Sequence, residues 1–138
     1  MCGDPHPWVE NAKHLDIFLH NKIEGMRKDI RVKRAKFIDR NNDLIQEYYF
    51  AHPRTKYMIN SIYNTHFTWS QVWDLFSLEA IMLENTWNRS IRLMFGLPLQ
   101  KHRYFICPIS ESEHLKSMLI KRFLNFTVKL ENSPKNSV

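Results

Sequence analysis

Residues 21–50 carry an apolar repeat that is typical of one long helix and of few other structures. Its side chains recur every seven residues, at Ile23, Ile30, Phe37 and Leu44. Because seven residues make about two turns of an α-helix, these positions share one face. We expect a helix from about Asn21 to Phe50 that His52-Pro53 ends, since Pro53 disfavours helical geometry in the residue before it.

Three further helices are expected, over about residues 54–63, 78–95 and 110–129. The second has an apolar stripe with helical spacing, at Ala80, Leu83, Trp87, Ile91 and Met94. The third has a comparable stripe, at Leu115, Met118 or Leu119, Phe123 and Phe126. Capping signals mark the helix ends: Thr68 with Gln71, Ser77, Gly96, and Ser110 with Glu113.

Residues 12–19 are the only strand that we expect. The nearest other apolar segment, Trp8-Val9, is too short to pair with it, so this strand would need partners from elsewhere. That suggests a sequence beginning inside a domain. With only 3 glycines and 6 prolines, the predicted fold is mainly α, with four to five helices after one short N-terminal strand.

The net charge of +6 is concentrated in two blocks. Residues 22–60 carry ten Lys/Arg against five acids, and residues 100–138 carry seven against three. In the first block Arg27, Lys28, Arg31 and Arg34 lie at helical neighbour spacings, which predicts a basic ridge beside the apolar stripe. Two basic blocks around a neutral, aromatic middle suggest contact with a polyanion, and a merely solvated helix face is the alternative.

Several functional classes find no support in the sequence. No Gly-rich phosphate loop, Gly-x-Ser-x-Gly elbow or Asp-Asp pair occurs, so we predict no catalytic residue. Cys2 with His6 and Cys107 with His114 are too widely spaced for a recognisable zinc finger, and we predict no metal site. The lack of a signal peptide and of an 18-residue apolar run predicts an intracellular protein of the nucleus or cytoplasm.

Several segments stand out by their order and spacing: Ala12 to Asp16, Arg34 to Ile38, Glu47 to His52, Ile59 to Asn64, Ser70 to Leu75, Thr86 to Arg92, Leu97-Pro98, His102 to Tyr104, Pro108 to Ser110, His114 to Lys116, and Leu119 to Phe123. Together they resemble the region after the palm in non-LTR (LINE-type) retrotransposon reverse transcriptases. The resemblance covers roughly residues 8–127. In that family the first segment lies at the primer grip, and the helices after it form the thumb and a connector.

The resemblance implies a fragment of a larger polymerase fold, divided into four parts. Residues 1–20 would be a remnant of the palm and primer-grip strand, 21–66 basic thumb-like helices, 67–130 a helical connector and 131–138 a flexible tail. The expected partners are an RNA or DNA primer–template and the palm domain, without any membrane. The family's cofactor is magnesium, and we expect none in this chain.

The resemblance also implies residues that contact nucleic acid. Lys13 and His14 would lie near the primer strand. The basic ridge, here with Lys33 beside Arg27, Lys28, Arg31 and Arg34, would lie near phosphates. Apart from the resemblance, the position of Tyr104 in a short turn after His102-Arg103 makes it the first choice for an aromatic that stacks on a base. The complete expected set is Lys13, His14, Arg27, Lys28, Arg31, Lys33, Arg34, Arg103, Tyr104, Lys121 and Arg122.

Three departures from the family pattern are visible. Asp16 and Trp69 stand where the family commonly has glycine, and the family's catalytic Tyr-x-Asp-Asp does not occur in this sequence. We therefore expect a non-catalytic part that binds template and primer. The alternative is a helical protein-interaction module without a nucleic-acid role, in which charge reversal at Arg31 and Arg34 has no effect on nucleic-acid retention. A small metal-dependent enzyme is a third reading.

Overall fold

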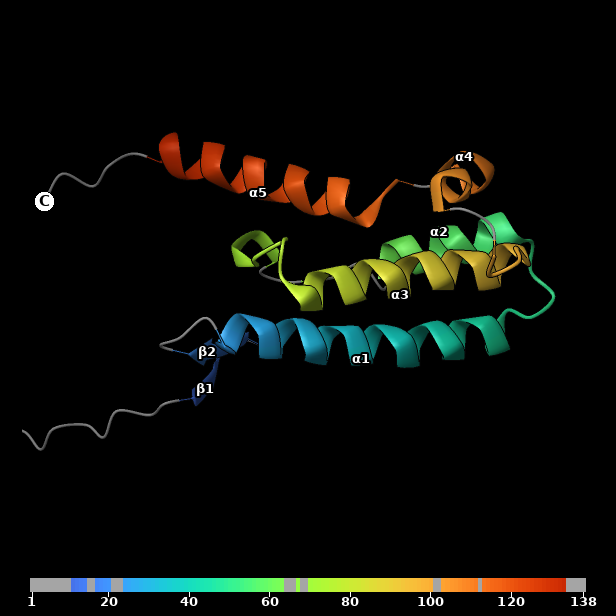
Figure 1. Ribbon diagram of the computed structural model, residues 1–138, viewed down its shortest axis with the longest axis horizontal. Coiled ribbons are helices and arrows are strands. Elements are labelled where there is room, and N and C mark those ends of the chain that lie inside the picture. Colours follow the sequence, from blue (N-terminus) through green and yellow to red (C-terminus); the bar gives the residue numbers. More distant parts are fainter. Residues whose placement is uncertain are drawn as a thin grey trace, which may run out of the picture.

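A computed structural model of the chain describes residues 11–14, 17–20, 24–63, 67, 70–100, 103–111 and 113–133. The protein is mainly helical, as predicted (Figure 1). Its helices are α1 (Glu24–Glu47), α2 (Pro53–Tyr63), α3 (Leu78–Phe95), α4 (Ile106–Ser110) and α5 (Leu115–Glu131), with two 3-10 turns, η1 (Ser70–Val72) and η2 (Arg103–Phe105). None of the described helices is both long enough and apolar enough to cross a lipid bilayer.

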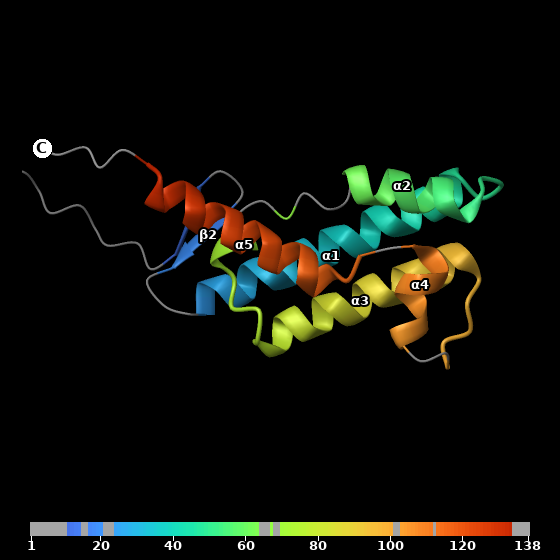
Figure 2. The same cartoon turned by 90° about the horizontal axis from the view of Figure 1, so that it is seen from above.

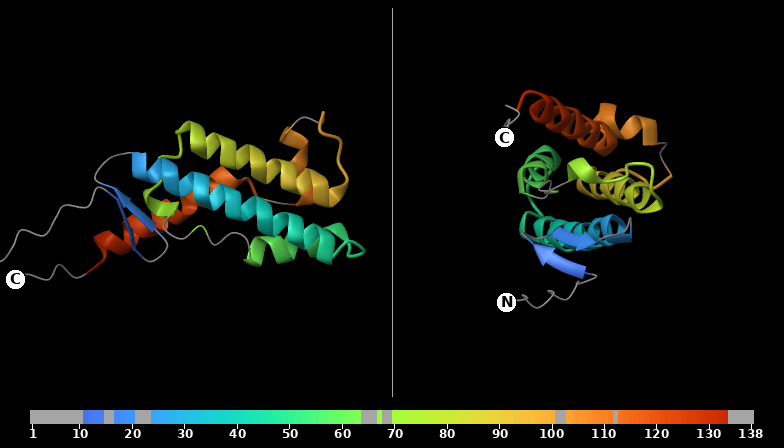
Figure 3. Two further views of the ribbon diagram at one scale, coloured as in Figure 1. Left: turned by 90° about the horizontal axis from the view of Figure 1, so that it is seen from below. Right: turned by 90° about the vertical axis from the view of Figure 1, so that its left-hand side faces the viewer.

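The helices form three layers. Helix α1 lies on one side, α2 and α3 form the middle, and α4 and α5 lie on the other side (Figures 1 and 3). Figure 2 shows α5 lying obliquely over the middle layer. Helices α1 and α3 run in the same direction, because Arg31 contacts Glu79, Arg34 contacts Thr86 and Asn41 contacts Ser90.

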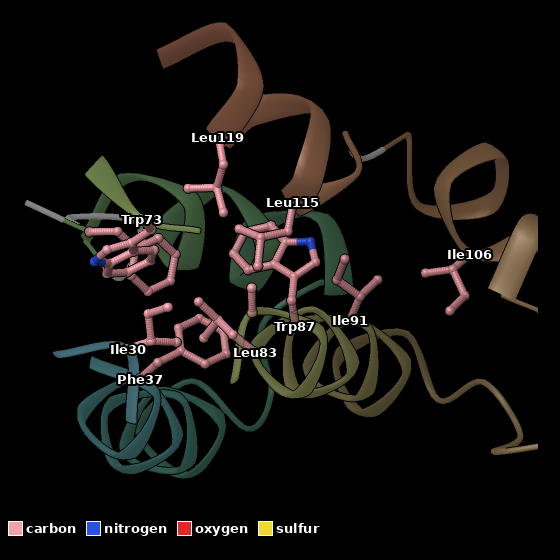
Figure 4. Close-up of a cluster of buried hydrophobic side chains, with 11 residues drawn as sticks. Ile30, Phe37, Trp73, Leu83, Trp87, Ile91, Ile106, Leu115 and Leu119 are labelled. Carbon is pink, nitrogen blue, oxygen red and sulfur yellow. The ribbon is translucent and has the colours of Figure 1, made fainter. Parts of the chain in front are cut away.

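The core lies between α1 and α3 and continues to α5 (Figure 4). The predicted stripe of α1 is confirmed at Ile30, Phe37 and Leu44, and every predicted stripe residue of α3 is also buried. Trp87 of α3 is 0% exposed, and its ring centroid lies 5.7 Å from that of Phe37. A tilted aromatic pair at this distance adds to the apolar contact that holds the two helices together.

Helix α5 follows its prediction only in part. Leu115 and Leu119 are buried against the core, but Phe123 is 48% exposed. The predicted capping box is also wrong. Ser110 is the last residue of α4, and its hydroxyl donates to the carbonyl of Ile106 (2.6 Å), so it cannot cap α5.

The caps of α3 agree with the sequence. The Ser77 side chain accepts a hydrogen bond from the backbone N–H of Ala80 (3.3 Å), which satisfies one free donor of the first turn. Gly96 ends the helix with φ 62°, a left-handed conformation that glycine adopts without steric cost. These two residues fix both ends of the helix that carries much of the candidate site.

The N-terminal segment differs from the single unpaired strand that we expected. It contains β1 (Asn11–His14) and β2 (Ile17–His20), which pair antiparallel with Ala12 opposite Leu19. The segment therefore supplies its own partner strand, and β2 contacts α1.

Candidate nucleic-acid interface

Three arginines of α1 point toward α3. Arg27, Arg31 and Arg34 are spaced by four and three residues, so they lie on one edge of the helix. An Arg31 Nη atom donates to Glu79 Oε1 at 2.7 Å, and Arg27 Nε lies 3.8 Å from Glu79 Oε2. Arg34 Nε donates to the Thr86 hydroxyl at 2.7 Å. The predicted basic ridge thus lies along the junction of two helices.

The Glu79 carboxylate does not neutralise this ridge. It faces two guanidinium groups, and the side chains of Arg27 and Arg31 stay 50% and 63% exposed. The hydrogen bond from Arg31 is the main cause that lowers the pKa of Glu79 below its ordinary value, so the carboxylate is ionised at neutral pH. Two cations against one anion leave a net positive charge that solvent can reach.

Beyond Arg34 the junction of α1 and α3 opens into a groove of about 460 Å³. Its polar lining comes from both helices: Arg34, Asn41, Asn42, Asn85, Thr86, Arg89 and Ser90. No acidic side chain lines it within the described part of the chain. The groove therefore offers cationic and amide donors, which suit an anionic ligand.

A second hollow of about 550 Å³ adjoins the groove and shares Asn85 and Arg89 with it. Arg92 of α3 and Arg103 of η2 add two more guanidinium groups, and the described lining again contains no acid. The Arg103 guanidinium lies over the Tyr104 ring, 5.6 Å from its centroid. Tyr104 is 63% exposed, so an accessible aromatic side chain stands beside the arginine cluster.

Sequence reasoning missed Arg89 and Arg92. Their stretch of sequence is nearly neutral, so a count of charges along the chain did not point to them. The available signal was spacing: Asn85, Asn88, Arg89 and Arg92 follow a polar stripe with helical periodicity. Only the packing of α1 and η2 against α3 brings that stripe together with Arg34 and Arg103.

Lys33 is a correction to the predicted ridge. It is only 8% exposed and faces the interior instead of solvent. The reason is its position, three residues after Ile30 and four before Phe37, both of which are buried in the core. A lysine on that face cannot reach a phosphate on the outer surface.

The remaining predicted residues do not all join the candidate interface. Lys28 is exposed on α1. Lys121 and Arg122 lie on α5, in the layer on the far side of α3 from α1 (Figure 1), and Lys121 pairs with Glu113. Desolvation by partial burial lowers the pKa of Arg122. The side chains of Lys13 and His14 lie outside the described residues, so their predicted role near a primer strand stays a prediction.

Within the described ranges, no three His, Cys, Asp or Glu side chains come together as a group that could hold a metal ion. Cys107 is not part of a disulfide there, while Cys2 and His6 lie outside those ranges. Comparison with known proteins returned no match to a protein family, a curated protein or a solved structure.

Proposed function

We propose that this chain binds nucleic acid through the arginine face formed by α1, α3 and η2. The observation that carries the proposal is the convergence of Arg34, Arg89, Arg92 and Arg103 on two adjoining hollows whose described lining contains no acid. Arg27 and Arg31 extend the face toward the start of α3, where they share Glu79. Guanidinium groups in such an array match the geometry of phosphate oxygens.

The length of the face suits several phosphates of one backbone. Between Glu79 and Arg92 the axis of α3 rises about 20 Å at 1.5 Å per residue. Contacts with phosphates along this distance supply affinity without reading base sequence. They also release condensed counterions, so binding of this kind weakens steeply as salt is added.

The ordered segments described in the sequence analysis extend the proposal to a protein family. We propose that the chain corresponds to the non-catalytic helical part of a non-LTR retrotransposon reverse transcriptase, which handles template and primer. The arginine face supports this reading because that part of the family holds a polyanion. Magnesium in the family is held by paired aspartates, and this sequence contains no Asp-Asp pair, so the proposal includes binding and no polymerisation step.

A matched pair of double variants tests the binding proposal. Arg31→Gln with Arg89→Gln removes two charges from the face, one from each helix. Lys36→Gln with Arg40→Gln removes the same charge from exposed positions of α1 that turn away from α3. Affinity for a primer–template duplex is measured by fluorescence anisotropy over a series of salt concentrations.

The first double variant is expected to reduce the slope of log K against log salt by about 1.8, since each lost phosphate contact removes about 0.9. The control pair should leave the slope nearly unchanged. Equal effects of the two pairs, or no salt-sensitive binding by the unmodified chain, would refute the proposal. Circular dichroism of all variants establishes that the helical content is unchanged.

A second function, docking of a protein partner, is favoured by the outer face of α5. Phe123, Leu124 and Val128 there are 48%, 54% and 52% exposed, which is unusual for apolar side chains along one helix. In this alternative the arginine face is only solvated, and the two double variants above behave alike. Phe123→Glu would then abolish partner binding without changing the affinity for nucleic acid.

A further inference from the structure

We infer that the second hollow, at the C-terminal end of α3, selects single-stranded over double-stranded nucleic acid. The inference rests on the proposed function and assigns a ligand class to one part of the arginine face. It requires that the hollow holds a phosphate while Tyr104 stacks on the adjacent base. Both groups would act on one nucleotide of a single strand.

The phosphate end of the site consists of three arginines. Arg89 and Arg92 are one helical turn apart on α3, and Arg103 reaches the same hollow from η2. Arg89 forms no ion pair with any described residue, and it is exposed. Three guanidinium groups around one concave space, without an acid in its described lining, suit a phosphate.

The base end of the site is the exposed ring of Tyr104. The guanidinium of Arg103 lies over this ring, so the same arginine lines the phosphate hollow and contacts the aromatic side chain. Asn85 and Asn88, on the wall of the hollow, add amide groups within the same space. Amides both donate and accept hydrogen bonds, which suits the polar edges of a base or a sugar.

A phosphate hollow beside an exposed aromatic ring favours single-stranded over double-stranded nucleic acid. In a duplex the bases are stacked inside the helix, so a side chain beside the phosphate cannot stack on a base without flipping it. In a single strand the base is free to lie on the ring while its phosphate stays in the hollow. The hollow, at about 550 Å³, also has the size of sites that hold a compact ligand such as one nucleotide.

The test compares two probes with the full chain: a fluorescent oligothymidine of about 12 nucleotides and its duplex with oligoadenine. The unmodified chain is expected to bind the single strand more tightly. Tyr104→Ala should weaken single-strand binding by roughly 10-fold, within the range found for loss of one stacked base, and change duplex binding less than about twofold. Tyr104→Phe keeps the ring and should retain binding, and Tyr104→Leu keeps apolar bulk without a ring and should not.

Phe105→Ala is the matched control, because Phe105 is a neighbouring aromatic, 58% exposed, whereas the ring that the Arg103 guanidinium covers is that of Tyr104. Its affinity for both probes should match that of the unmodified chain. Equal binding of the two probes, or an equal loss on both in Tyr104→Ala, overturns the inference and leaves the proposed function standing. Absence of salt-sensitive binding to either probe overturns both.

Discussion

Two buried tryptophans differ in one hydrogen bond, and this makes them a controlled test of the core. Trp73 Nε1 donates to Asp29 Oδ2 at 2.9 Å, in a place where Asp29 is 2% exposed. Trp87 Nε1 is buried without a hydrogen-bond partner among the described residues. The nitrogen atoms of the two indoles are seen in Figure 4. Replacing either tryptophan by phenylalanine removes the same atoms. At Trp73 the change removes a hydrogen bond, whereas at Trp87 it removes a buried N–H group that has no partner among the described residues.

The size of the difference follows from known costs. Each substitution removes roughly 40 Å³ of side chain, which costs about 1 kcal/mol at about 24 cal/mol per Å³ of cavity. Trp73→Phe also removes a hydrogen bond to a buried carboxylate, for a further 1.5–3 kcal/mol or so. Trp87→Phe removes an unsatisfied buried N–H, which returns about 1–3 kcal/mol. We expect Trp73→Phe to be less stable than Trp87→Phe by at least about 2 kcal/mol.

Urea unfolding followed by far-ultraviolet circular dichroism measures this difference. A total stability of about 5–15 kcal/mol makes a gap of that size visible as a shift of the midpoint at an unchanged slope. If the two variants lose the same stability, or if Trp87→Phe loses more, the indole of Trp87 has a partner or that of Trp73 contributes nothing. Either result refutes the reasoning.

Four further predictions concern single residues. Hydrogen bonding from Arg31 lowers the pKa of Glu79 below 4.5 in the folded protein. The ionised Glu79 side chain therefore stabilises the fold above pH 4.5, and this stabilisation is lost as the pH falls through the lowered pKa of the folded state. The difference in melting temperature between the unmodified chain and Glu79→Gln should thus shrink as the pH is lowered below 4.5. Ser77→Ala should cost about 1 kcal/mol in urea unfolding through loss of the N-cap bond. Gly96→Ala should cost about 1–2 kcal/mol by the same assay, from the left-handed φ of 62° alone, since an added Cβ meets no atom within 4 Å. Lys33→Leu should leave nucleic-acid affinity within about twofold of the unmodified chain in an anisotropy titration, because Lys33 is buried.

The helices were predictable because their signals are local. The period of seven gave the buried face of α1, and the spacing of three and four gave that of α3, since helical geometry alone puts such residues on one side. Ser77 and Gly96 bounded α3 correctly because caps depend on adjacent backbone groups. Ser110 was misjudged because it has two possible backbone partners, and the turn into α4 selected the carbonyl of Ile106.

The candidate site was predictable only where charge and exposure coincide. Arg27, Arg31 and Arg34 lie on an edge beside the apolar stripe, and that edge remains open to solvent. Lys33 carries the same charge on the same helix, but it lies on the buried face with Ile30 and Phe37, so its side chain points inward. Net charge along a segment does not distinguish these cases, because it ignores the direction of each side chain.

From the sequence alone come the helical class, the buried faces of α1 and α3, and a basic ridge on α1, all of which follow from periodicity within one helix. Only the tertiary structure decides which helices pack together and which charged side chains that packing brings close to one another. Packing α1 parallel to α3 sets Arg34 beside Thr86 and Arg89, and the turn after α3 brings Arg103 back to Arg92. Residues this far apart in the chain come together through packing of apolar faces, and no local pattern encodes that meeting.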